Sequence, residues 1–302
     1  MRIILLGPTA SGKTELSLQL AEELKTSIIS ADSRQCYKYL DIGTAKPIKE
    51  ELDRVTHFNI SNLELSDEDS AVKFHNRAVD WEKEILNDST HILYVGGSTL
   101  HLTGLIQPFS EIPDSNPEHI EQLNVEIEEN GIESLYEKLK EVDPDYIERI
   151  DGMNRQRIIR ALDVWLQTGR PFSSFHHREE INLPENTIVF GLTHPREKLY
   201  ERINKRVDTM IEEGFIDEVQ SILDQGFSKE LQSLQTVGYR EVITYLDGDY
   251  TREQMIEKIK INTRRYGKRQ LTWFRRWGFI KWLDASELSV EEMKEQVLHA
   301  IS

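Results

Sequence analysis

Short apolar runs alternate with helix-period patterns over two parts of this chain. The apolar runs predict strands at residues 2–6, 27–30, 91–95 and 187–192, and near the end at 279–283, where the sequence reads FIKWL. Apolar residues with helical spacing predict helices after residue 14 and at 71–86, 98–106, 197–213 and 252–277. Strands that alternate with helices are typical of an α/β fold built on a parallel sheet.

The stretch between residues 116 and 184 has a different character. It is acidic, rich in Glu and helical by pattern, and it contains no convincing strand before TIVFGL at 187–192. We therefore expect an all-helical insertion domain at 116–184. The core would then consist of a first part at 1–115 and a second part at 185–302, which ends in a basic helix.

A phosphate-binding loop follows the first predicted strand. GPTASGKT matches the pattern G-x-x-x-x-G-K-[ST] through Gly7, Gly12, Lys13 and Thr14, between a strand and a helix as the pattern requires. The glycines let backbone N–H groups surround an anion, the lysine adds positive charge, and the threonine hydroxyl can ligate Mg²⁺. The fold class expected is therefore a P-loop NTPase-like parallel sheet flanked by helices, with the helical insertion.

Asp32 is the acidic residue best placed to work beside this loop. It follows the second predicted strand, and ligands of open parallel sheets sit outside the carboxyl ends of the strands. Its carboxylate can act as a base or hold the water shell of a metal ion, but a turn residue or helix N-cap is an equally good interpretation from position alone. The third strand ends in Val95-Gly96-Gly97 without an acid, which is unlike the pattern of ATPases and GTPases.

Charge is distributed unevenly along the chain. The net charge of the 302 residues is −16, yet residues 252–281 carry ten basic and two acidic side chains, and residues 114–150 carry twelve acidic and three basic ones. The basic stretch can dock a polyanion, or it can be a solvated helix face. The single cysteine, Cys36, excludes an intramolecular disulfide and a multi-cysteine zinc site. No apolar run is long enough to span a membrane, and we expect a cytoplasmic protein.

Several longer motifs resemble the tRNA dimethylallyltransferase family, also called tRNA isopentenyltransferases. They are, in order, GPTASGKT, ISADSRQCYKYLDIGTAKP, YVGGSTLHLTGL, RQRIIRALDVWLQTG, TVGYREV and KRQLTWFRR. The resemblance implies transfer of a dimethylallyl group from dimethylallyl diphosphate to the exocyclic N6 of the adenosine on the 3′ side of the anticodon in tRNA. That base is flipped out of the anticodon loop into a channel.

The resemblance also implies roles for residues around the loop. Asp32 would accept a proton from the attacking amine, and Thr14 would bind Mg²⁺, the one expected cofactor. Arg206 is the matching position for an arginine near the diphosphate and is preferred to Arg202, one helical turn earlier. The diphosphate itself would be held by Gly7, Thr9, Ala10, Ser11, Gly12, Lys13 and Thr14.

Contacts with the anticodon stem-loop of tRNA carry over by motif. The implied residues are Asp32, Ser33, Arg34, Gln35, Ser98, Gln156, Arg157, Ile158, Ile159, Arg160, Gln235, Gly238, Tyr239, Arg240, Lys268, Arg269, Gln270, Trp273 and Arg275. Three positions depart from the family pattern. Ser98 and His101 lie in GGSTLH where GGTGLY is usual, and Gln235 stands where many members have a basic residue.

Two other functions remain possible from the residues alone. An ATP-dependent small-molecule kinase would explain the phosphate loop and use the insertion as a lid, but it leaves DIGTAKP and the basic tail without a role. A non-catalytic RNA-binding protein would explain the tail but not the loop. We expect a monomer that acts on tRNA and dimethylallyl diphosphate and does not associate with a membrane.

Overall fold

The computed structural model describes residues 1–107, 112–175 and 182–302. The chain divides into two compact units, one formed by residues 1–107 and 181–302 and the other by residues 108–180. The insertion expected at 116–184 lies largely within the second of these, but its role as an inserted domain stays a prediction. Among the described residues, no helix is both long enough and apolar enough to cross a membrane.

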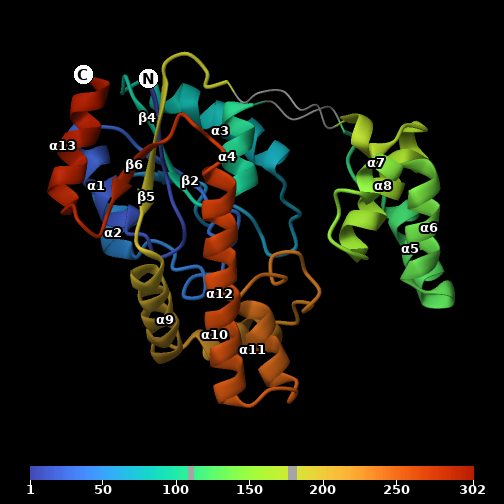
Figure 1. Cartoon of the computed structure of the whole chain (residues 1–302). Coiled ribbons are helices and arrows are strands. Elements are labelled where there is room, and N and C mark those ends of the chain that lie inside the picture. The colour runs from blue at the N-terminus through green and yellow to red at the C-terminus, as the bar shows by residue number, and fades with distance from the viewer. Residues whose placement is uncertain (108–111, 176–181) are drawn as a thin grey trace. The chain divides into compact units, whose positions relative to one another are not determined.

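A parallel six-stranded sheet forms the centre of the larger unit (Figure 1). Its strand order is β3-β2-β4-β1-β5-β6. The strands are β1 (Arg2–Leu6), β2 (Ile28–Ala31), β3 (His57–Phe58), β4 (Ile92–Gly96), β5 (Thr187–Thr193) and β6 (Lys281–Asp284). The expected α/β class with a parallel sheet is confirmed. The strand β3 was not expected, because two residues are too few to show a periodic pattern.

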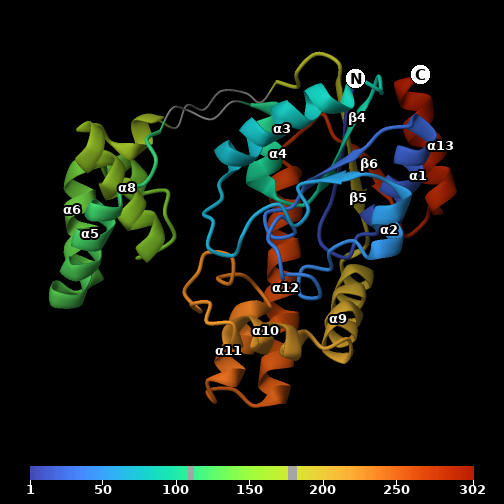
Figure 2. The same ribbon diagram turned by 180° about the vertical axis from the view of Figure 1, so that it is seen from behind.

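Helices cover both faces of this sheet and extend beyond its carboxyl edge (Figures 1 and 2). Those of the larger unit are α1 (Lys13–Leu24), α2 (Lys49–Arg54), α3 (Ala71–Ile85), α4 (Thr99–Ile106), α9 (Arg196–Glu212), α10 (Phe215–Asp224), α11 (Tyr239–Leu246), α12 (Arg252–Phe274) and α13 (Val290–Ile301). The sequence analysis missed α13, which starts at a capping box between Ser289 and Glu292 and packs against α1.

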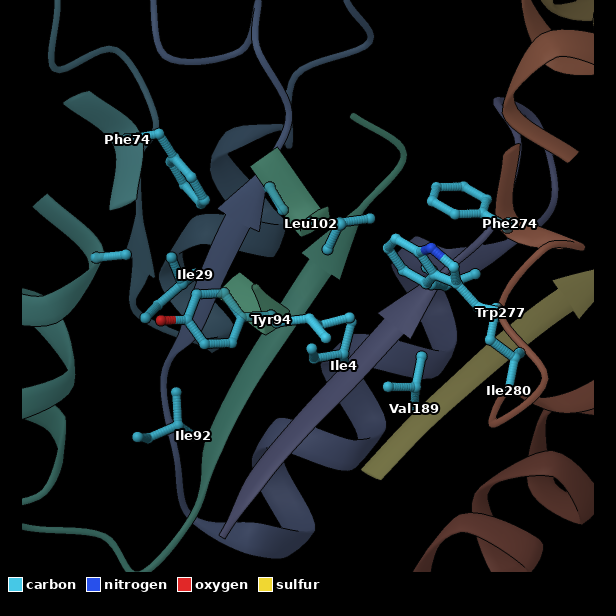
Figure 3. Packing of buried hydrophobic residues seen from close by; sticks show 14 of the residues in the cluster. Ile4, Ile29, Phe74, Ile92, Tyr94, Leu102, Val189, Phe274, Trp277 and Ile280 are labelled. Atoms are coloured by element: carbon cyan, nitrogen blue, oxygen red, sulfur yellow. The ribbon is translucent and has the colours of Figure 1, made fainter. Parts of the chain in front are cut away.

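The central strands are apolar on both sides because both faces are buried. In β1, Ile4 and Leu6 join the core under α3 and α4, whereas Ile3 and Leu5 join the core under α1 and α13. Figure 3 shows the first of these cores, in which side chains from β1, β2, β4 and β5 meet Phe274 at the end of α12 and Trp277 just after it. The sheet is therefore sandwiched between two helical layers.

A third core lies beyond the carboxyl ends of the strands. It joins the segment after β2 to α9, α10, α11 and the first half of α12, and its members include Tyr37, Leu40, Phe215, Tyr239 and Met255. Figure 1 shows these helices below the edge where the strands end. This helical cluster surrounds the region where a P-loop fold places its ligand.

The smaller unit is helical throughout its described residues. It contains α5 (Pro117–Asn130), α6 (Ile132–Val142), α7 (Pro144–Ile147), α8 (Arg155–Thr168) and a 3₁₀ turn, η1 (Phe172–Phe175). Leu135, Leu139, Ile158 and Leu162 are fully buried in a core of its own. The smaller unit thus has a hydrophobic core separate from those of the larger unit.

Candidate functional site

The phosphate loop, residues 7–14, connects β1 to α1. Gly12 has a φ of 96°, which glycine adopts without strain, and Ala10 has a φ of 61°, in the left-handed region that other residues rarely adopt. Lys13 Nζ donates to the carbonyl oxygens of Gly7 at 3.0 Å and Pro8 at 2.9 Å. The ammonium group thus lies inside the loop, where a bound anion would sit.

The surroundings of the phosphate loop shift the pKa values of the charged groups there. Burial and the nearby Arg206 guanidinium together lower the pKa of Lys13 to about 8, and Asp32 acts in the opposite direction. Burial also lowers the pKa of Arg206, and Asp32 opposes that shift as well. Two half-buried cations and one half-buried carboxylate therefore lie near one another, an arrangement suited to an anionic ligand.

Three side chains from distant elements hold the loop from outside. His194 Nε2 lies 2.9 Å from the carbonyl oxygen of Ser11, and Arg202 Nε donates to that of Ala10 at 2.7 Å. Gln270 Oε1 accepts from the Thr9 N–H at 3.1 Å. The loop is thus fixed by contacts from the segment after β5, from α9 and from α12.

The two candidate arginines have different positions on α9. Arg206 lies inside the site, near Lys13 and Asp32, and its Nη2 donates to the carbonyl oxygen of Thr44 at 3.3 Å. Arg202 binds the backbone of the phosphate loop instead. This geometry favours Arg206 as the arginine that meets the ligand, and its role stays a prediction.

The interpretation of Asp32 as a turn residue is confirmed, and its role as a base stays a prediction. Its Oδ1 accepts the N–H groups of Arg34 at 2.8 Å and Gln35 at 3.2 Å, as a turn residue does. Within the described part of the chain, Oδ2 accepts no hydrogen bond. The turn therefore orients the carboxylate and leaves one oxygen available for chemistry.

The DIGTAKP segment, residues 41–47, is held by one carboxylate from α10. Glu218 accepts the backbone N–H groups of Asp41, Ile42 and Gly43 at 3.1, 2.6 and 3.3 Å, and also the Tyr239 hydroxyl at 2.6 Å. A Cβ at Gly43 would lie only 2.2 Å from the ring of Phe215, so only glycine fits there. Sequence reasoning missed Glu218 because nothing local marks a residue of an ordinary helix as the partner of a loop about 175 residues earlier.

The DIGTAKP segment that Glu218 holds contacts the site through the carbonyl oxygen of Thr44. That oxygen accepts from Arg206, and Gln35 Nε2 donates to it at 3.3 Å and to the Ala45 carbonyl at 3.0 Å. The DIGTAKP segment thus joins Arg206 to the turn that carries Asp32. Its position, fixed by Glu218, sets the geometry of the site.

The residues expected to contact tRNA occupy varied positions. Lys268 and Arg269 in α12 and Arg275 directly after it are exposed. Trp273 is half-buried with its Nε1 donating to Thr103 Oγ1 at 3.2 Å, and Gln270 is buried. The exposed cations can meet a phosphate backbone directly. A role for Gln270 in RNA binding has no such exposure to support it.

The other expected contacts fall on loops and helix starts. Ser98 is the residue before α4 and is nearly buried, while Arg240 at the start of α11 is exposed. Tyr239 and Ile158 are fully buried in the cores of their respective units, so their side chains reach no ligand in this conformation. As part of the tRNA interface these residues stay predictions.

The departure at His101 has a structural explanation. Its ring is buried and stacks on Phe74, with centroids 4.3 Å apart and planes within 6°. Burial and the charges of Arg77 and Arg34 lower its pKa to about 3, so the imidazole is neutral at physiological pH. His101 is therefore an aromatic packing residue here.

Comparisons with known proteins agree with this arrangement. A family model described as IPP transferase matches residues 35–277. A tRNA dimethylallyltransferase of Natranaerobius thermophilus is 42% identical over 99% of this chain and 91% of its own length. One of Christiangramia forsetii is 44% identical over 95% of this chain and 94% of its own.

Two solved structures are also similar to this chain over nearly its whole length. A tRNA isopentenylpyrophosphate transferase from Bacillus halodurans is 36% identical with a TM-score of 0.73, covering 99% of this chain and 96% of that protein. A eukaryotic dimethylallyltransferase acting on tRNA is 25% identical with a TM-score of 0.81, covering 98% of this chain and 77% of that protein. The likeness extends over both units of the chain.

Proposed function

Because the chain belongs to the tRNA dimethylallyltransferase (IPP transferase) family, we propose that it prenylates tRNA with dimethylallyl diphosphate. The acceptor is N6 of the adenosine on the 3′ side of the anticodon, which becomes N6-isopentenyladenosine. The observation that carries the proposal is the cationic phosphate loop with Asp32 beside it. A diphosphate leaving group and a proton acceptor are the two things that this transfer requires.

The donor binds with its diphosphate in the phosphate loop. Lys13 and Arg206 neutralise the negative charge that grows on the diphosphate as the allylic C–O bond breaks, together with the backbone N–H groups of residues 7–14. Their partial burial strengthens this interaction relative to one between fully exposed charges.

Mg²⁺ is the expected cofactor, and the site suits it. Thr14 is the second residue of α1 and lies beside the phosphate loop, where its hydroxyl is one oxygen ligand of the kind that Mg²⁺ prefers. Within the residues that the structure describes, no three His, Cys, Asp or Glu side chains group as a metal site. The ion would therefore take its other ligands from diphosphate oxygens and water. When bound, Mg²⁺ supplies further neutralisation of the leaving group.

Asp32 acts on the acceptor adenine, whose N6 amine must lose a proton. As the C–N bond forms between the adenine N6 and the allylic carbon, the amine loses a proton, and Oδ2 of Asp32 accepts it. The hydrogen bonds from Arg34 and Gln35 to Oδ1 keep the carboxylate in place during this step. The adenine N6 is a poor nucleophile because its lone pair is delocalised, so a correctly placed acceptor is valuable.

The RNA is held by exposed cations, principally Lys268 and Arg269 on α12 and Arg275 directly after it. Contacts of this kind offset the free energy of flipping a base out of its stack, which is about a few kcal/mol per base. We propose that one copy of the chain suffices, since every residue in this account comes from a single chain. A cytoplasmic location is part of the proposal because the substrate is tRNA.

Label transfer tests the proposal directly. The protein is incubated with unmodified tRNA and labelled dimethylallyl diphosphate, and in parallel with labelled ATP and no RNA. We expect label in tRNA only in the first reaction. Label transferred from ATP to a small molecule would indicate the kinase, and tRNA binding with no transfer would indicate a non-catalytic RNA-binding protein.

A further inference from the structure

The helix α12 has two faces with different environments. Gly267, Gln270 and Phe274 are buried, whereas Lys268 and Arg269 between them are exposed. The buried face passes directly over the phosphate loop, because a Cβ at Gly267 would lie 3.8 Å from Cβ of Pro8. One helix therefore carries the candidate RNA surface on one side and contacts the donor loop on the other.

Gln270 makes the polar contacts on that buried face. Its Oε1 accepts from the Thr9 N–H at 3.1 Å, and its Nε2 donates to the Gly97 carbonyl at 2.7 Å. Thr9 belongs to the phosphate loop, and Gly97 belongs to the double-glycine segment after β4. A flipped amide would place donor against donor and acceptor against acceptor, so the surroundings allow only one orientation.

The space around this amide is closely filled. A Cβ at Gly97 would lie 2.4 Å from Gln270 Nε2 and 3.0 Å from the Gly7 carbonyl oxygen, so the double-glycine segment can approach only because it has no side chain there. Gln270 is 3% exposed, and both ends of its amide are used. Contact with RNA would require breaking two buried hydrogen bonds.

We propose that Gln270 is a positioning residue that fixes the phosphate loop against the double-glycine segment and α12, and that it does not contact tRNA. This inference rests on the proposed function. The loop amides and Lys13 must meet the diphosphate while Asp32 meets the adenine, and displacement of about 1 Å in such a site can cost about 10²-fold in rate. Gln270 holds the loop where both substrates can react.

Three variants separate positioning from RNA binding. Gln270→Ala removes both hydrogen bonds, Gln270→Glu keeps the shape and one acceptor, and Arg269→Ala removes the adjacent exposed cation. For each protein we measure the affinity for inorganic diphosphate by calorimetry, tRNA affinity, single-turnover transfer and thermal unfolding. Diphosphate binding reports on the loop even if no prenyl transfer occurs.

We expect Gln270→Ala to weaken diphosphate binding and to slow transfer about 10-fold or more, with unchanged tRNA affinity. Arg269→Ala should weaken tRNA binding and leave diphosphate binding unchanged. Loss of tRNA affinity in Gln270→Ala with normal diphosphate binding would overturn the proposal. A wild-type protein that binds diphosphate but does not prenylate tRNA would instead contradict the proposed function.

Gln270→Glu adds a readout that a purely structural role would not change. The ionised carboxylate accepts from the Thr9 N–H but repels the Gly97 carbonyl, whereas the protonated form accepts and donates like the amide. The transfer rate of this variant relative to wild type should therefore rise as the pH falls. A ratio that does not depend on pH would count against the proposal, and this test remains available if Gln270→Ala does not fold.

Discussion

At the scale of single residues, Asp32 carries the most specific prediction. Asp32→Asn retains an oxygen that can accept from the Arg34 and Gln35 N–H groups, so the turn should persist. It removes the proton acceptor, and we expect single-turnover transfer to fall by about 10²-fold or more while tRNA affinity changes little.

The control for this prediction is Asp67→Asn. Asp67 is an exposed carboxylate whose Oδ2 accepts the Glu64 N–H at 2.8 Å, and it has no part in the proposed chemistry. It should transfer at the wild-type rate. If Asp32→Asn also turned over normally, Asp32 would not be the base.

Lys13 makes donor binding depend on pH. Its pKa is about 8 in the unliganded protein, because burial and Arg206 disfavour the charged form. A bound diphosphate favours the charged form, so binding above pH 8 must take up a proton. We expect the affinity for dimethylallyl diphosphate to be nearly constant below pH 8 and to fall by up to about tenfold per pH unit above it.

Titration calorimetry between pH 6.5 and 9.5 measures this. In Lys13→Arg the guanidinium stays charged throughout this range, so the break near pH 8 should disappear even if the affinity itself is lower. Persistence of the break in that variant would assign it to another group.

At the scale of elements, the DIGTAKP segment depends on Glu218. Glu218→Gln replaces one of two accepting oxygens by a donor, which faces N–H groups it cannot bind. We expect a loss of about 1–3 kcal/mol in the free energy of unfolding and a higher KM for the donor, because the Thr44 carbonyl no longer holds Arg206.

Tyr239→Phe serves as the comparison for Glu218. It removes a single hydrogen bond to the same carboxylate and leaves the loop N–H groups bound. Its donor KM should stay near the wild-type value. Equal effects of the two variants would mean that packing around Phe215, not the carboxylate, positions the segment.

The exposed face of α12 has its own test. If Arg269 contacts an RNA phosphate, Arg269→Ala should weaken tRNA binding and reduce the slope of log affinity against log salt by roughly 0.7–0.9. Lys83→Ala removes one charge from an exposed ion pair late in α3 and should leave the slope unchanged. An unchanged slope in both would show that this face of α12 is only solvated.

Secondary-structure elements could be predicted from the sequence better than contacts between distant residues. Apolar runs located five of the six strands to within two residues. Strands β1, β2, β4 and β5 are apolar because both faces of the sheet are covered there, whereas β6 is an edge strand with Lys281 and Trp282 exposed. The phosphate loop and Asp32 were also visible, since their chemistry lies in adjacent residues. Glu218, His194 and the buried contacts of Gln270 were not, because each acts on a segment more than 170 residues away and no local pattern records such a pairing.

At the scale of the whole molecule, the two units have separate cores. A substitution in one core should therefore lower the stability of that unit alone. Leu162→Ala leaves a cavity in the smaller unit, where Leu162 is fully buried, and should destabilise that unit by about 2–5 kcal/mol. The donor site belongs to the larger unit, so affinity for dimethylallyl diphosphate should not change.

Leu166→Ala on the same helix is the matched control, because Leu166 is 38% exposed and its loss should cost much less stability. Thermal unfolding and calorimetry with the donor measure both effects. A loss of donor affinity in Leu162→Ala would show that the units are energetically coupled.

The bond between Thr9 and Gln270 spans 261 residues. During translation, the phosphate loop leaves the ribosome long before the helix that fixes it. α13, which packs on the helix after the loop, follows later still. A nascent chain therefore carries the phosphate loop without its contact to Gln270 until α12 has been synthesised, and the donor site is completed only after that.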